Sequence, residues 1–131
     1  MSWVEVFAVL VVSHLAGDYL LQTDWQARHK RGGLSGDAVA RRALVTHVTT
    51  YTVAFIPALI WMRDTLGAGG IVGVAALIFI PHLVQDDGRL LLSYLRSVKG
   101  CSEQTAAEIF TSVDQSFHIL VLFGISLVAA G

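Results

Sequence analysis

The sequence predicts an all-α polytopic membrane protein, in which a four-helix transmembrane bundle forms a single domain over residues 1–131. Two observations support this fold class. Apolar residues make up 54% of the chain, charged residues make up only 15%, and the mean hydropathy is +0.63, whereas globular domains carry roughly 25% charged residues. Four long apolar stretches also follow one another, and a spanning helix needs about 20 mostly apolar residues.

The predicted spans lie at about residues 3–22, 43–62, 65–85 and 110–130. The first is interrupted by Glu5, His14 and Asp18, so it qualifies if its polar side chains face inward. The second and third contain no Asp, Glu, Lys or Arg, so both qualify as spanning helices by length and composition alone. The fourth is short, and the helical stretch Thr105–Val113 that leads into it extends it.

Small residues and prolines give details of the spans. Gly69 and Gly73 lie four positions apart, a spacing that predicts close approach of a neighbouring helix. Pro57 and Pro81 each lack a backbone N–H donor, so a kink is predicted in the second and in the third span.

The basic residues predict the orientation of the chain. Eight of the nine lie in the connections between spans one and two and between spans three and four: Arg28, Lys30, Arg31, Arg41, Arg42, Arg89, Arg96 and Lys99. Only Arg63 lies on the opposite side. The positive-inside rule then places the eight in the cytoplasm and both termini outside. Segments 36–44 and 86–100 are predicted to form amphipathic helices at the cytoplasmic interface.

Each predicted span carries a histidine, and three of them add an aspartate one helical turn away. The pairs are His14 with Asp18, His82 with Asp86, and Asp114 with His118, whereas His47 stands without an aspartate in the second span. Residues four apart lie on one face of a helix. Because consecutive spans alternate in direction, these side chains are all expected near the cytoplasmic end of the bundle.

This arrangement favours a metal site. An aspartate at the centre of a spanning helix costs about 2.5–3.5 kcal/mol, and a divalent cation offsets the carboxylate charge while it binds neutral imidazole. Mixed nitrogen and oxygen ligands suit zinc, with manganese or iron as alternatives. The seven candidate ligands are His14, Asp18, His47, His82, Asp86, Asp114 and His118. One zinc takes about three or four protein ligands, so one or two ions are expected.

The function that this pattern favours is a membrane-embedded, metal-dependent hydrolase that acts on a lipid or lipid-linked phosphate at the cytoplasmic leaflet. The metal activates water, and Asp18 or Asp86 acts as the catalytic general base. Gln22 and Gln115 support the ligands or contact substrate. Lys30 and Arg89 bind an anionic group or, as the alternative, snorkel to the interface.

Two other classes of function stay open at this point, and with them the question whether the protein is an enzyme. A haem-binding electron carrier would use two histidines as axial ligands, but it gives the aspartates no role. A proton- or cation-conducting protein, or one that binds a membrane partner, is the non-enzymatic alternative, since intramembrane His and Asp residues are typical of proton relays. The net charge of −1 gives no indication of a nucleic-acid partner.

The chain resembles a family of small bacterial and phage membrane proteins, domain-of-unknown-function family 3307. The resemblance rests on HLAGDYLLQTDW at 14–25 followed by Lys30, on His47, on HLVQDDGR at 82–89 and on DQSFH at 114–118. In the third motif the family usually has an apolar residue before the aspartate and a lysine three positions after it, where this chain has Gln85 and Arg89. The pattern is also similar to that of inner-membrane metal-dependent hydrolases and, more distantly, of helical zinc phospholipases. The resemblance implies the bacterial inner membrane and, by analogy, hydrolysis.

Overall fold

The computed structural model describes residues 1–131 and contains helices but no strands. The all-α prediction is therefore confirmed. The helices are α1 (Trp3–Leu15), α2 (Asp24–His29), α3 (Ala38–Ala54), α4 (Ile56–Asp86), α5 (Arg89–Ser93) and α6 (Glu103–Ala130). Two π-helical turns, η1 (Ala16–Leu20) and η3 (Tyr94–Val98), continue α1 and α5, and a 3-10 turn, η2 (Gly33–Ser35), precedes α3.

Three segments are long and apolar enough to cross a membrane: Trp3–Leu20, Ile56–Asp86 and Glu103–Ala130. The first and the last correspond to predicted spans. The predicted span 43–62 is not one helix, because α3 ends at Ala54 and α4 begins at Ile56. Pro57 directly follows this break. Because proline has no backbone N–H, it cannot donate the hydrogen bond that would continue α3 through this point. The predicted count of four spanning helices is thus not confirmed.

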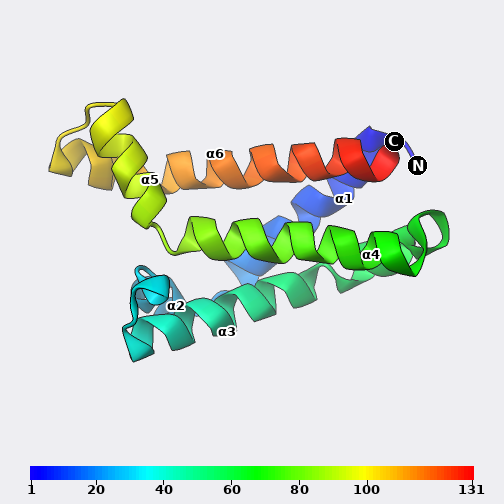
Figure 1. The fold of residues 1–131 in the computed structure, drawn as a ribbon, viewed down its shortest axis with the longest axis horizontal. Coiled ribbons are helices and arrows are strands. Elements are labelled where there is room, and N and C mark those ends of the chain that lie inside the picture. The colour runs from blue at the N-terminus through cyan, green and yellow to red at the C-terminus, as the bar shows by residue number, and fades with distance from the viewer.

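Helix α4 is itself divided at Gly67, whose φ of 64° and ψ of 178° are not helical. Glycine adopts a positive φ without the steric cost that a Cβ imposes. The chain reverses here, so that the first part of α4 continues α3 and the second part returns alongside it (Figure 1). Consecutive long segments therefore run in alternating directions, as the sequence predicts, although the helix boundaries differ.

The interior is apolar toward one end and polar toward the other. A core of 11 buried apolar residues fills the half that contains the two termini: Val6, Leu10, Tyr51, Phe55, Ala58, Met62, Val74, Ile78, Leu122, Ile125 and Ala129. A smaller core of Leu91, Leu95, Ala106 and Phe110 joins α5 to the start of α6 at the opposite end. The buried histidines and aspartates lie between these two cores.

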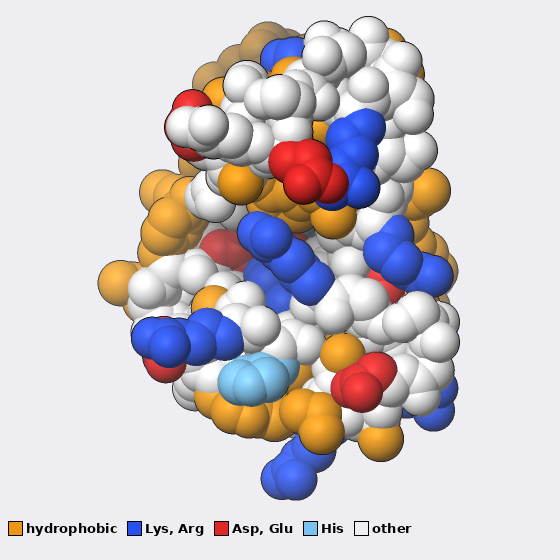
Figure 2. Space-filling model, turned by 90° about the vertical axis from the view of Figure 1, so that its left-hand side faces the viewer, with side chains coloured by type: hydrophobic (Ala, Val, Ile, Leu, Met, Phe, Trp, Pro, Cys, Tyr) orange, Lys and Arg blue, Asp and Glu red, His pale blue; other side chains and the backbone are white.

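The two ends of the molecule differ in charge. Both termini lie at one end, and α2 and α5 lie at the other (Figure 1). Figure 2 looks onto this second end, where Lys and Arg side chains gather. The amphipathic segment 36–44 forms the start of α3, where the Asp37 side chain accepts a hydrogen bond from the Ala40 N–H at 2.7 Å. The segment 86–100 contains α5 and η3.

Close packing against a neighbouring helix occurs at Gly17 and not at the predicted pair. A Cβ at Gly69 or Gly73 would have no neighbouring atom within 4 Å, so the close contact predicted there is not formed within this chain. A Cβ at Gly17 would lie 2.6 Å from Cδ2 and 3.3 Å from Cα of Tyr51. This glycine therefore allows η1 to pack against α3, which brings Asp18 close to His47.

Candidate metal centre

The seven predicted ligands come from every long segment of the fold and gather in one buried cluster. Helix α1 and its π-turn η1 carry His14 and Asp18, α3 carries His47, α4 carries His82 and Asp86, and α6 carries Asp114 and His118. The π-turn contains Asp18, and such turns occur frequently at functional sites. Two groups of side chains have ligand atoms that all lie within 4.8 Å of one another.

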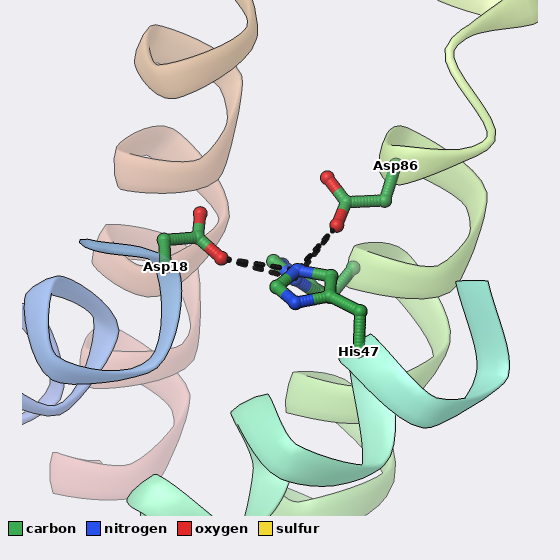
Figure 3. A group of neighbouring side chains, drawn as sticks. Asp18, His47 and Asp86 are labelled. Atoms are coloured by element: carbon green, nitrogen blue, oxygen red, sulfur yellow. Dashed lines mark hydrogen bonds and ion pairs between the residues drawn. The ribbon is translucent and has the colours of Figure 1, made fainter. Parts of the chain in front are cut away.

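The first group consists of Asp18, His47, His82 and Asp86. The Nε2 atom of His47 lies 2.7 Å from Oδ2 of Asp86 and 3.3 Å from Oδ1 of Asp18 (Figure 3). The Nε2 atom of His82 lies 3.1 Å from Oδ2 of Asp86 and 3.4 Å from Oδ1 of Asp18. The two Nε2 atoms are 3.1 Å apart.

These separations match the size of a small coordination shell. Metal–ligand bonds of about 2.0–2.2 Å in a tetrahedral arrangement place neighbouring ligand atoms about 3.3–3.6 Å apart. The observed distances of 2.7–3.4 Å reach that range only at their upper end. The first group could therefore hold a small cation once its ligand atoms move slightly apart.

The second group consists of Asp86, Asp114 and His118. The Nδ1 N–H of His118 donates to the backbone oxygen of Asp114 at 2.8 Å, which leaves the lone pair of Nε2 free. Nε2 lies 3.5 Å from Oδ1 of Asp86. A neutral imidazole whose other nitrogen donates to an oxygen is the usual form of a metal-binding histidine.

Asp86 links the two groups. Its Oδ2 faces His47 and His82, whereas its Oδ1 faces His118. A carboxylate with this placement can bridge two cations, and two-metal sites have ions about 3.5–4 Å apart. The structure therefore offers two groups of possible ligand atoms that share Asp86.

Several polar atoms of the cluster are buried and have no hydrogen-bond partner: Oδ1 of Asp18, Nδ1 of His82, Oδ1 of Asp86 and Nε2 of His118. A buried polar atom without a partner costs about 1–3 kcal/mol. Three of these atoms, all except Nδ1 of His82, face the ligand groups. A cation in each group, or water bound to it, would satisfy these three.

His14 lies beside the two groups and belongs to neither. The carboxylate of Asp18 can only accept, so the Gln115 side chain donates its Nε2–H to Oδ2 of Asp18 at 3.2 Å. The Gln115 Oε1 then accepts from Nε2–H of His14 at 2.9 Å. The remaining nitrogen of His14, Nδ1, is an acceptor and lies 3.0 Å from the hydroxyl of Tyr51, which donates to it.

A hydrogen-bonded chain thus runs from Tyr51 through His14 and Gln115 to Asp18. Both nitrogens of His14 are occupied in it, so His14 orients the carboxylate of Asp18 in this geometry. Gln115, predicted as a supporting residue, is the link. Tyr51 was not among the predicted site residues, and its position one helical turn after His47 is the sequence signal for it.

The other predicted supporting residues differ in their distance from the cluster. The Nζ of Lys30 donates to Oδ2 of Asp86 at 2.8 Å. The Nε2 of Gln22 lies 3.4 Å from the nitrogens of His47. Arg89 instead donates to Oδ2 of Asp87 at 2.6 Å, away from the ligand groups.

Asp87 is a buried carboxylate outside the set of predicted site residues. Its Oδ1 accepts the backbone N–H of Leu34 at 2.8 Å, and its backbone oxygen accepts the N–H of Gly32 at 2.8 Å. These bonds fix the α2–α3 connection against the end of α4. They hold Lys30 over the cluster.

A cavity of about 300 Å³ opens beside the ligand groups. The carboxylates of Asp18, Asp86 and Asp114 line it together with the cations of Lys30 and Arg31. It lies at the end of the molecule where the basic side chains gather (Figure 2). The cluster is therefore accessible from that end to a small polar molecule.

The comparisons with known proteins give one match. A family model described as "Protein of unknown function (DUF3307)" matches residues 6–130. No curated protein and no solved structure matches the chain.

Proposed function

We propose that this chain, which belongs to the DUF3307 family of proteins of unknown function, is a membrane-embedded, metal-dependent hydrolase. The observation that carries the proposal is the double role of Asp86. This one carboxylate stands between an Asp18–His47–His82 group and an Asp114–His118 group, all buried beside an accessible cavity. Mixed nitrogen and oxygen ligands favour zinc, with manganese or iron as alternatives.

The proposal includes the arrangement in the membrane. The chain forms a four-span bundle in the bacterial inner membrane, in which α3 and the first part of α4 together supply the second span. Three segments of spanning length and the reversal at Gly67 support this arrangement. Basic side chains at the end with α2 and α5 support placing that end, and the cavity, in the cytoplasm.

The residues of the cluster take different roles in this proposal. His47, His82 and Asp86 would hold the first cation, and Asp86, Asp114 and His118 would hold the second. Catalytic zinc sites typically have three protein ligands and leave a fourth position to water or substrate. Oδ1 of Asp18 lies 3.3–3.4 Å from the nitrogens of His47 and His82, and it would accept the proton of a water bound beside them.

The reaction that this arrangement suits is hydrolysis of an ester or phosphoester. Bound divalent cations supply Lewis-acid activation of water and of the substrate oxygen. The water oxygen forms a bond to the phosphorus or carbonyl carbon, and the bond from that atom to the leaving oxygen breaks. Asp18 accepts the proton of the water and returns it to the leaving oxygen. Gln115, hydrogen-bonded to Oδ2 of Asp18, keeps Oδ1 directed at the cluster.

Two observations disfavour the conducting and the haem-binding alternatives, and neither bears on the partner-binding alternative. A proton or cation conductor needs a polar path through the membrane, but the hydrogen-bonded chain ends at Tyr51, and the apolar core of 11 residues fills the bundle beyond it. A haem needs space between its axial ligands, but Nε2 of His47 and Nε2 of His82 are 3.1 Å apart and carboxylates surround them.

Turnover by the purified protein tests the proposal. Wild-type protein in lipid nanodiscs should hydrolyse at least one of three vesicle-presented probes, namely a phosphomonoester lipid, a phosphodiester lipid and a carboxyl ester lipid. A chelator should abolish turnover and added zinc should restore it. Asp18→Asn should lose about 10²–10⁴-fold in turnover and keep its zinc, whereas Asp64→Asn, an exposed control, should behave as wild type. A folded, zinc-loaded wild type that cleaves none of the probes contradicts the proposal.

A further inference from the structure

A second cavity adjoins the polar one and has a different character. It has a volume of about 240 Å³ and is lined mainly by apolar side chains, namely Val84, Leu90, Leu91, Tyr94 and Phe117. Gln85 and Asp114 complete its wall, and both also line the polar cavity. The two cavities therefore share Asp114, a member of the second ligand group, as a lining residue.

The apolar cavity lies where the amphipathic segment meets the bundle. Its lining comes from the end of α4, from α5 and η3, and from α6. Leu90 is 67% exposed, and Val84 and Phe117 are partly exposed as well. In the proposed membrane arrangement, an apolar cavity beside the basic end of the bundle lies at the level where lipid headgroups meet the hydrocarbon chains. Water gains little from filling an apolar cavity, whereas a lipid chain buries apolar surface there.

The polar cavity suits an anionic group once a cation is bound. Three carboxylates against Lys30 and Arg31 give its lining a formal charge of −1, which one divalent ion changes to +1. Lys30 lies above Asp86, and Arg31 is held with its guanidinium carbon 3.8 Å from the centre of the Phe110 ring. Lysine and arginine are the side chains that bind phosphate, arginine through paired hydrogen bonds.

We infer that the substrate is a phosphate-bearing lipid, whose phosphate lies in the polar cavity and whose hydrocarbon chain lies in the apolar cavity lined by Val84, Leu90 and Phe117. This inference rests on the proposed function, because the bound cation supplies the positive charge that the phosphate needs. The shared wall at Asp114 places the junction between phosphate and chain beside the ligand groups.

Binding of a non-hydrolysable pair of probes tests the inference without any turnover. Dodecylphosphonate and methylphosphonate carry the same headgroup on a C–P bond and differ in chain length. Native mass spectrometry on zinc-loaded protein in a maltoside detergent gives the affinity of each, with inorganic phosphate as competitor. Wild type should bind dodecylphosphonate at least about tenfold more tightly, because even a few buried methylene groups suffice for that ratio.

Two tryptophan variants on α4 provide the matched comparison. Val84→Trp fills the apolar cavity and should lower the affinity for dodecylphosphonate about tenfold or more, with the affinity for methylphosphonate unchanged. Val72→Trp alters an exposed valine of the same helix outside both cavities and should bind both probes as wild type does. Equal affinity of wild type for the two probes, or equal behaviour of the two variants, overturns the inference.

The zinc content of the same samples separates the two proposals. If wild type holds zinc but binds both phosphonates equally well, the hydrolase proposal stands and the lipid inference is wrong. If folded wild type holds no zinc and still prefers dodecylphosphonate in a way that depends on Val84, the hydrolase proposal is wrong and the site is a lipid-binding site. Equal displacement of both probes by inorganic phosphate identifies a free phosphate site and overturns the lipid assignment.

Discussion

The ring of Tyr51 lies flat against the imidazole of His82, with ring centres 3.4 Å apart and planes inclined by only 4°. At the same time its hydroxyl donates to His14, and its ring covers Gly17. One side chain of α3 therefore positions a candidate ligand by stacking and the candidate base, Asp18, through a hydrogen-bonded chain. These two effects can be separated by substitution.

Tyr51→Phe keeps the stacked ring and removes the hydroxyl. The chain through His14 and Gln115 then loses its first donor, and the orientation of Asp18 becomes less fixed. Turnover should fall about 10–100-fold, the usual effect of removing such an outer partner, whereas zinc stoichiometry should not change. Thr49→Val, which removes an exposed hydroxyl from the same helix outside both cavities, serves as control. Unchanged turnover in Tyr51→Phe would show that the chain has no positioning role.

Asp86→Asn and Asp114→Asn should differ in metal stoichiometry. Asp86 belongs to both ligand groups, whereas Asp114 belongs only to the second. Asp86→Asn should therefore weaken the binding of both ions, whereas Asp114→Asn should abolish the binding of one ion and leave the binding of the other unchanged. Zinc titration monitored by a chromophoric chelator gives both numbers. Equal loss in the two variants would contradict the bridging role of Asp86.

Gly17→Ala should destabilise the fold through a single methyl group. The added Cβ would meet the Tyr51 ring at 2.6 Å and its Cα at 3.3 Å, and overpacking of this kind costs about 1–3 kcal/mol. Gly124→Ala in α6 is the matched control, because no atom lies within 4 Å of its Cβ position. Alanine should there stabilise the helix by about 0.5–1 kcal/mol. Thermal unfolding in detergent, with a lower midpoint for the first variant only, checks the prediction.

Lys30→Met should affect metal and substrate in opposite directions. The ammonium group lies 2.8 Å from Oδ2 of Asp86, an oxygen that faces the first ligand group. Because the ammonium repels a cation and occupies a lone pair of this oxygen, its removal should tighten zinc binding severalfold. Turnover and phosphonate affinity should fall, since an anion-binding cation is lost. Lys99→Met, an exposed control outside the cavities, should change neither quantity, and weaker zinc binding by Lys30→Met would contradict this account.

Much of the site could be predicted from local spacing. The i,i+4 pairs and the alternation of direction are enough to bring His47, His82 and Asp86 to one level of the bundle, because both depend only on helix geometry. The segments do alternate, and these residues do meet. The helix boundaries were harder to predict, because hydropathy does not distinguish one continuous span from two helices, α3 and α4, that are separated at Phe55.

The individual roles could not be read from spacing, because they depend on contacts between distant segments. His14 has the same spacing to Asp18 as His82 has to Asp86, yet its Nε2 donates to Gln115, which lies 101 positions away. The π-turn that contains Asp18 and the contact between Gly17 and Tyr51 also arise from packing of η1 on α3. Local periodicity describes one helix face and carries no information on which residue of another helix will meet it.

The convergence of His47, His82 and Asp86 on a bound cation is the central claim, and elemental analysis tests it most directly. Wild-type protein and the double variant His47→Ala/His82→Ala are purified in parallel, incubated with zinc, and freed of excess metal. We expect one or two zinc ions per folded wild-type chain and at most one in the folded double variant, held by the remaining group of Asp86, Asp114 and His118. Folded wild type without zinc, or a double variant that binds as much zinc as wild type, would contradict the claim.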